Sequence, residues 1–285
     1  MYNYYSKDTF IRSGINVGNI PNLLNLAFYS TCDDDTGFDY LSRNNMRWSQ
    51  GSSIVNTEGP FSIDNSAFTT TQYTYLGQYL MSPKLDLSSF SLSFYLKISG
   101  RETIGVYQDD QDSQSPYPTR FSILTAGLNL VIQVFNSSAT TATEASNVIS
   151  AYKFTNALKS NEWTFVTLVY DSTDKTLKFY DEAANKREVK TGVNIDQVDT
   201  GRIVLGQARG NGDYTYFSPS SAIACISLHN YPMSQVDIAL LTCACQFKDK
   251  EAPSIVNNNQ RFPFSARNSM QNYQCLSDLH STISG

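Results

Sequence analysis

The sequence predicts an all-β fold, a sandwich or jelly roll of short strands, and three observations support this prediction. Many short segments alternate apolar and polar side chains, which is the period of a strand with one buried face. Clusters of Gly, Pro, Asn, Asp and Ser separate these segments and are typical of turns. Only one segment inside the strand-rich region has the pattern of a helix.

The clearest strand covers residues 90–98, where apolar side chains recur at every second position. Residues 163–170 are apolar on both faces, which predicts a strand in the middle of a sheet. A turn-rich stretch, residues 171–175, follows and leads into residues 177–180, so these two strands should form a hairpin. Further strands are predicted at residues 26–30, 73–81, 104–107, 121–124, 128–135, 202–205 and 222–228.

One short helix is predicted at residues 234–241. Ser234 can cap its start, and Asp237 stands three residues later, as in a capping box. We therefore divide the chain into a polar lead-in at residues 1–22, a sandwich at residues 23–243, and an irregular, Cys-containing C-terminal extension at residues 244–285.

Composition and charge exclude several classes of function. The chain has 285 residues, 41% of them hydrophobic, so a sizeable core is feasible. Its net charge is −5, and no basic run is longer than Lys186-Arg187, so the phosphate-neutralising stripe of a nucleic-acid-binding protein is absent from the sequence. No apolar run reaches the ~20 residues of a membrane span, and the polar start does not read as a signal peptide.

Five cysteines are disulfide candidates, and four of them crowd the C-terminal part of the chain. They are Cys32, Cys225, Cys243, Cys245 and Cys275. An odd number leaves one free or paired with another chain, and five reduced thiols in an intracellular protein are the alternative. No C-x-x-C pair occurs and the chain has only two histidines, so we expect no zinc site. Asn136 begins an Asn-Ser-Ser glycosylation triplet, which fits an exported chain.

The order of the segments resembles the laminin-G-like domains of the concanavalin A-like lectin/glucanase family. The resemblance begins at residues 24–29 and the acidic turn at residues 33–37. It continues through residues 83–97, the Trp163-led strand with its partner at 177–181, and the closing strands before the Ser234 helix. The family usually has Trp where this chain has Tyr95. Together the matching segments cover about residues 23–243.

The resemblance implies an antiparallel jelly roll of two sheets that is usually extracellular and binds glycans, proteins or calcium. It also implies that the first and last strands lie side by side, which would bring Cys32 near Cys225. Some relatives are glycosidases, but their Glu-x-Asp-x-Glu strand signature is missing here. His229 lies in an apolar strand, where a structural role is expected. We therefore expect no enzyme activity.

Calcium is the one cofactor that we expect to be worth testing. Asp109, Asp110 and Asp112 place three carboxylates within four residues, and hard oxygen donors of this kind suit Ca²⁺. The spacing is not that of an EF-hand, so a solvated acidic turn is the alternative explanation.

Exposed aromatic side chains beside polar loops are the candidates for sugar binding, because a flat ring contacts a sugar face while amides and carboxylates bind its hydroxyls. The candidates occur in two segments: Tyr107 and Tyr117 around the acidic loop, and Asn211, Asp213, Tyr214 and Tyr216 in a glycine-rich loop. Packing of these tyrosines inside the sandwich is the alternative.

From these patterns we expect an extracellular or cell-surface recognition module that binds a glycan or an extracellular protein through loops of the sandwich, with calcium as a possible aid. The alternative is a non-catalytic structural subunit of an extracellular filament, coat or larger complex. The odd cysteine, the low charge and the long irregular ends support this second hypothesis.

Overall fold

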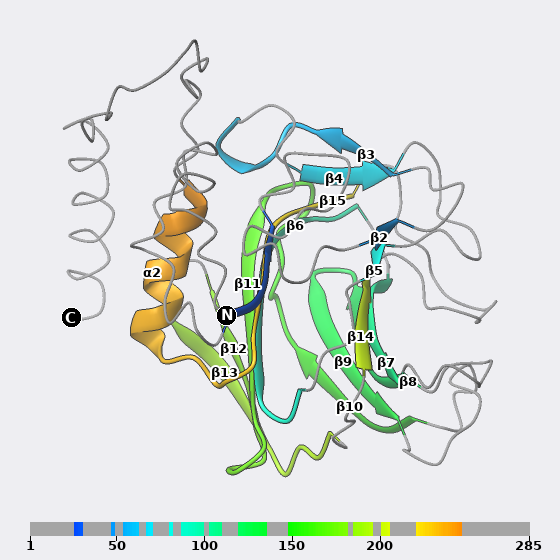
Figure 1. Cartoon of the computed structure of the whole chain (residues 1–285), viewed down its shortest axis with the longest axis vertical. Coiled ribbons are helices and arrows are strands. Elements are labelled where there is room, and N and C mark those ends of the chain that lie inside the picture. Colours follow the sequence, from blue (N-terminus) through cyan, green and yellow to red (C-terminus); the bar gives the residue numbers. More distant parts are fainter. Residues whose placement is uncertain are drawn as a thin grey trace, which may run out of the picture.

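Within the residues that the structure describes, two antiparallel sheets and one α-helix form the fold (Figure 1). The computed structural model describes residues 26–30, 47–48, 54–62, 67–70, 80–81, 87–99, 103–109, 119–135, 148–181, 185–195, 201–205 and 221–246. The sheets lie face to face, and the helix covers the far side of one of them. The predicted all-β fold, a jelly-roll sandwich with one short helix, is confirmed.

The first sheet, sheet A, has eight strands. In spatial order they are β13 (Lys186–Thr191), β12 (Thr176–Tyr180), β11 (Thr164–Asp171), β6 (Phe90–Lys97), β15 (Ala222–His229), β4 (Ala67–Thr70) and β3 (Ile54–Thr57), and β1 (Leu26–Ser30) also pairs with β15. A short 3-10 helix, η3 (Pro60–Ser62), lies between β3 and β4 in the chain.

The second sheet, sheet B, has seven strands. Their order is β10 (Val148–Phe154), β9 (Asn129–Phe135), β8 (Thr119–Ala126), β7 (Thr103–Asp109), β14 (Gly201–Leu205), β5 (Leu80–Met81) and β2 (Arg47–Trp48). Among the described strands, β10 and β13 each end their sheet, because each is the first strand of its order.

Alternating side chains of both sheets fill the space between them. In β6, Leu92 and Phe94 point inward and are 1% and 0% exposed. Phe90 of sheet A stacks on Phe121 of sheet B, with ring centroids 5.1 Å apart and planes within 11°. Aromatic stacking of this kind adds about 0.5–1.5 kcal/mol to the burial of the rings.

The outward side of sheet A is buried as well, under the helix α2 (Gln235–Gln246). Tyr95 and Phe165 point to this side and form a second apolar cluster with Ile238 and Leu241 of the helix. The apolar residues on both faces of β11 are explained by this arrangement. The predicted central position of this strand is confirmed, since it lies between β12 and β6.

The predicted cap of the helix is confirmed. The Asp237 N–H donates to Ser234 Oγ over 3.2 Å, while the Ser234 N–H donates to Asp237 Oδ2 over 3.0 Å. The helix ends at Gln246, five residues beyond the predicted end at residue 241. It continues because nothing between Leu241 and Gln246 breaks a helix, and because Leu241 and Thr242 are buried. No described helix combines the length and apolar character needed to cross a membrane.

Most predicted strands exist with shifted ends, and the one at residues 26–30 has the predicted bounds. Residues 73–79 of another predicted strand lie outside the described part. Five strands were not predicted: β2, β3, β4, β10 and β13. The last two end their sheets, so fewer of their residues are buried and the apolar alternation that identifies a strand is weak.

Replacing Ser91 by Ala should destabilise the connection between β15 and the helix. Ser91 Oγ donates to the Tyr231 carbonyl and accepts from the Met233 N–H, both over 2.8 Å, and its loss leaves both groups without this partner. We expect the free energy of unfolding to fall by about 1–3 kcal/mol in urea titrations. The exposed Ser88→Ala is the control and should change it by less than about 0.5 kcal/mol. Equal effects in both variants would contradict the role of Ser91.

Alkaline pH should destabilise the outward cluster of sheet A through Tyr180. Burial raises the pKa of this phenol above its ordinary value, because the charged form is desolvated. The unfolded chain therefore loses its proton first, so stability is retained below pH ~10 and falls as the pH rises toward the raised pKa. Tyr180→Phe should show a smaller loss between pH 8 and pH 11 in urea titrations. An unchanged pH profile would contradict this assignment.

Candidate functional site

The two sheets differ in what covers their outward faces. Sheet A carries α2 on its outward side, in contact through a buried apolar cluster. The outward side chains of sheet B belong to neither of the two apolar clusters of the described residues. Among the outward side chains of sheet B, Ala151 and Lys153 of β10 are exposed, so this end of the face can present side chains to a ligand.

Pairing of the strands fixes which residues share this face, because cross-strand partners point to the same side of a sheet. Ser122 of β8 pairs with Gln133 of β9, which pairs with Ala151 of β10. The next row consists of Leu124, Val131 and Lys153. We call these six residues the sheet B face.

The side chains of the sheet B face are buried at β8 and exposed at β10. Ser122 is fully buried, and its hydroxyl donates to Gln133 Oε1 over 3.4 Å. Gln133 is half-buried, while Ala151 and Lys153 are exposed. The amide of Gln133 is thus oriented by a buried hydroxyl and stands at the border of the accessible region. Such a group can bind a sugar hydroxyl at a low cost in side-chain entropy.

A β-bulge lies beside this face, at Arg120. Tyr107 pairs with Phe121 and Gln108 pairs with Thr119, so Arg120 is the extra residue between the two pairs. Its side chain is only 8% exposed, which is unusual for a guanidinium. Bulges often re-aim a side chain next to a functional site. The sequence analysis missed Arg120, Ser122 and Gln133. The sequence signal that could have identified Arg120 is its charge near the start of the strand segment at residues 119–126.

The structure describes only two of the predicted ligand and metal residues. Tyr107 lies in β7 and pairs with Phe121 and Ile203, both of which belong to the core between the sheets. Asp109 is the last residue of β7 and pairs with Gly201. The remaining candidates lie outside the described residues: Tyr117, Asp110, Asp112, Asn211, Asp213, Tyr214, Tyr216 and Asn136.

The two predicted loops leave sheet B at opposite ends of its strands. The acidic loop follows Asp109, at the end of β7 where β14 begins with Gly201. The loop with Asn211 follows Leu205, which pairs with Gly105 near the start of β7. Because the acidic loop and the loop with Asn211 begin at opposite ends of these strands, they are two separate candidates for a ligand site.

The described residues contain no group of three His, Cys, Asp or Glu side chains close enough to hold a metal ion together. Asp109 is the one predicted metal ligand among them, and Ca²⁺ takes six to eight oxygen ligands. The calcium prediction therefore depends on Asp110 and Asp112 and stays a prediction.

His229 has the surroundings of a structural residue. It is fully buried, and its ring meets Tyr231 edge-on, with centroids 5.6 Å apart. Its partner in the sheet is Ser91, whose hydroxyl binds the backbone before α2. A base in hydrolysis must reach a substrate, and a fully buried ring in this packed layer does not meet that requirement.

Cys225 forms a disulfide bond and lies at an irregularity in β15. Its φ of 48° is left-handed, a conformation that costs a non-glycine residue energy. As a result, Ala224 and Cys225 both belong to the outward cluster, and Ile226 returns to the core between the sheets. The other four cysteines lie outside the residues whose side chains are described.

The comparisons with known proteins agree with this fold, a sandwich of two antiparallel sheets. The family model "Concanavalin A-like lectin/glucanases superfamily" matches residues 68–239, more than half of the chain. The chain belongs to this family. No curated protein matches.

Several toxin domains of known structure share the fold. The ligand-binding domain of botulinum neurotoxin serotype D, in complex with N-acetylneuraminic acid, has a TM-score of 0.52 and 14% identity over 76% of this chain and 50% of that one. The binding domain of Paraclostridial Mosquitocidal Protein 1 has a TM-score of 0.52 and 14% identity, covering 77% and 52%. The chain thus spans about half the length of these structures, and at this identity they show the fold alone.

We expect Cys32 to be the partner of Cys225, because β1 and β15 are neighbours and Ser30 pairs with Ile226. Non-reducing peptide mapping should find the Cys32–Cys225 link, and Cys32→Ser should free the Cys225 thiol and cost about 2–4 kcal/mol. Cys275→Ser is the control and should leave Cys225 bonded. The competing partner is Cys245, because Cys225 packs with residues of α2. A free Cys225 thiol in Cys245→Ser, and not in Cys32→Ser, would contradict the expected pair.

Proposed function

We propose that this chain is a non-catalytic recognition module, extracellular or at the cell surface, that binds a glycan or a protein partner through the sheet B face and the loops bordering it. One observation carries the proposal. Sheet A is packed on both sides, against sheet B and against α2, whereas the outward residues Ala151 and Lys153 of sheet B are exposed.

The chemistry of the sheet B face favours a glycan. Gln133 offers both a donor and an acceptor, and the exposed Lys153 offers a cation for a ligand carboxylate or sulfate. Apolar Val131 lies between them and provides contact for the C–H face of a sugar ring. The serotype D domain that shares this fold binds an acidic sugar, N-acetylneuraminic acid, which supports acidic glycans as the first class to test.

The predicted loop residues extend this proposal. Tyr117 on one loop, and Asn211, Asp213, Tyr214 and Tyr216 on the other, are proposed as additional contacts. Calcium held by Asp109, Asp110 and Asp112 is proposed as a stabiliser of the first loop. Calorimetric titration of Ca²⁺ into the chain, before and after Asp110→Asn, tests the metal separately from the sugar.

Glycan-array screening of the whole chain, followed by calorimetry with and without EDTA, tests the proposed function. We expect sialylated or otherwise acidic glycans to bind. Gln133→Ala should weaken binding about tenfold, a loss of ~1.4 kcal/mol, because one oriented hydrogen-bonding group is removed. Gln235→Ala on α2 is the matched control and should leave binding unchanged. Silence on the array and in calorimetry would overturn the glycan proposal.

The second candidate function is a structural subunit, and the odd number of cysteines favours it. One of five cysteines must lack a partner within the chain, so it is available for a link to another chain. Non-reducing gels and light scattering distinguish the two: a covalent oligomer supports the structural role, and a strictly monomeric chain contradicts its covalent form.

A further inference from the structure

The terminal strands of the two sheets differ in how they protect their free edges. A terminal strand presents unpaired backbone N–H and C=O groups, and natural proteins guard such edges with charged side chains. In β13, the sequence Lys186-Arg187-Glu188-Val189-Lys190-Thr191 has four charges in six residues. In β10, Val148–Phe154, the only charge is Lys153.

The β10 edge is accessible and partly apolar. Alternate residues Ile149, Ala151 and Lys153 are exposed, and the Ile149 side chain is 54% exposed. Among the described strands, β10 pairs with β9 alone. β10 has a bulge at Ile149, where its register against β9 shifts, and pairs regularly from Ser150 to Phe154. A regular run of this length can accept an added strand.

Positive charge surrounds this edge, although the whole chain is acidic. Lys190 of β13 lies over the Phe154 ring of β10, with its Nζ 5.5 Å from the centroid, which places the two terminal strands next to each other. Together these strands hold four basic residues, Lys153, Lys186, Arg187 and Lys190, and one acidic residue, Glu188. Lys190 forms an ion pair with Glu188, and Arg187 forms one with Asp181, so Lys153 and Lys186 account for the excess positive charge. The net charge of the whole chain is −5.

We propose that the β10 edge is a docking site for an acidic, extended polypeptide segment that adds to sheet B as a further strand. Main-chain hydrogen bonds to β10 supply the affinity. An apolar side chain opposite Ile149 and a carboxylate opposite Lys153 supply the specificity. A second copy of this chain fits less well, because pairing β10 with β10 brings two basic edges together. This site is independent of the proposed glycan function, which depends on Gln133.

Fluorescence anisotropy with a labelled seven-residue peptide, Thr-Glu-Thr-Val-Thr-Val-Thr (the Val-Glu peptide), tests the proposal on the whole chain, because its Glu and Val side chains share one face, as Lys153, Ala151 and Ile149 do. We expect saturable binding, about tenfold or more weaker in Lys153→Glu, and retained within about threefold in the control Lys186→Glu on β13. A Val-Lys peptide should fail with the natural chain and bind to Lys153→Glu. Gln133→Ala should bind the Val-Glu peptide normally, so this test and the glycan test fail independently.

Peptide changes keep the test valid if a protein variant misfolds. Replacing single peptide residues by Pro should abolish binding at alternate positions only, because alternate N–H groups of an added strand face β10. Absence of Val-Glu binding, equal loss in Lys153→Glu and Lys186→Glu, or equal tolerance of Pro at every position would each overturn the proposal. A dimer that Ile149→Asp disrupts would also overturn it, in favour of a second copy.

Discussion

The double burial of sheet A is the constraint on which the rest of the structure depends. Each of its central strands must offer apolar side chains to sheet B on one face and to α2 on the other. Leu92, Phe94 and Val166 serve the first face, while Tyr95 and Phe165 serve the second. Burial of apolar area contributes about 25 cal/mol per Å², so the two clusters together are the main stabilising term of this layer. No described helix packs on the outer side of sheet B, where the polar residues Ser122, Gln133 and Lys153 lie.

The layer beneath α2 is not uniformly apolar, and its polar part has a structural explanation. The register aligns Thr167, Ser93 and Ser227 in one row, and places Ser91 next to His229 in the adjacent row. All five side chains are fully buried. Ser93 and Thr167 bind each other over 2.9 Å, and Ser91 holds the backbone leading into the helix. The hydrogen bonds of Ser91, Ser93 and Thr167 offset the cost of burying their hydroxyl groups.

The sequence predicted the central strands and the helix start well, because these segments carry strong local signals. Five alternating apolar residues identify β6, and Ser234 with Asp237 identifies the cap of α2. Terminal strands were missed, since β13 consists largely of charged residues that have no apolar period. The residues of the candidate site were harder to predict from the sequence than the terminal strands. Ser122 and Gln133 are eleven positions apart in sequence and meet only through the register of β8 and β9, which no local pattern encodes.

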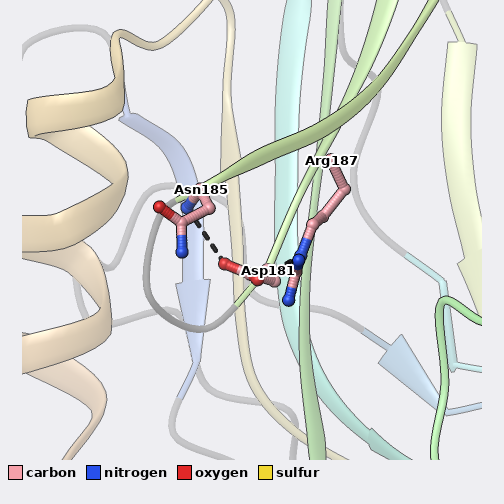
Figure 2. A network of polar contacts seen from close by, with 3 residues as sticks. All are labelled: Asp181, Asn185 and Arg187. Atoms are coloured by element: carbon pink, nitrogen blue, oxygen red, sulfur yellow. Dashed lines mark hydrogen bonds and ion pairs between the residues drawn. The ribbon is translucent and has the colours of Figure 1, made fainter. Parts of the chain in front are cut away.

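The terminal strands β13 and β10 also differ in their charge. Asp181 and Arg187 form an ion pair at the β12–β13 turn, where the Asn185 N–H also donates to Asp181 over 2.9 Å (Figure 2). These contacts lie at a bulge, where Arg187 is the extra residue of β13 against β12, and a charged edge of this kind discourages further pairing. The terminal strand of sheet B, β10, carries a single charge, Lys153, and has a bulge at Ile149. The proposed selection for an acidic partner therefore depends on Lys153, whereas the proposed recognition on the sheet B face depends on Gln133, which a buried hydroxyl orients.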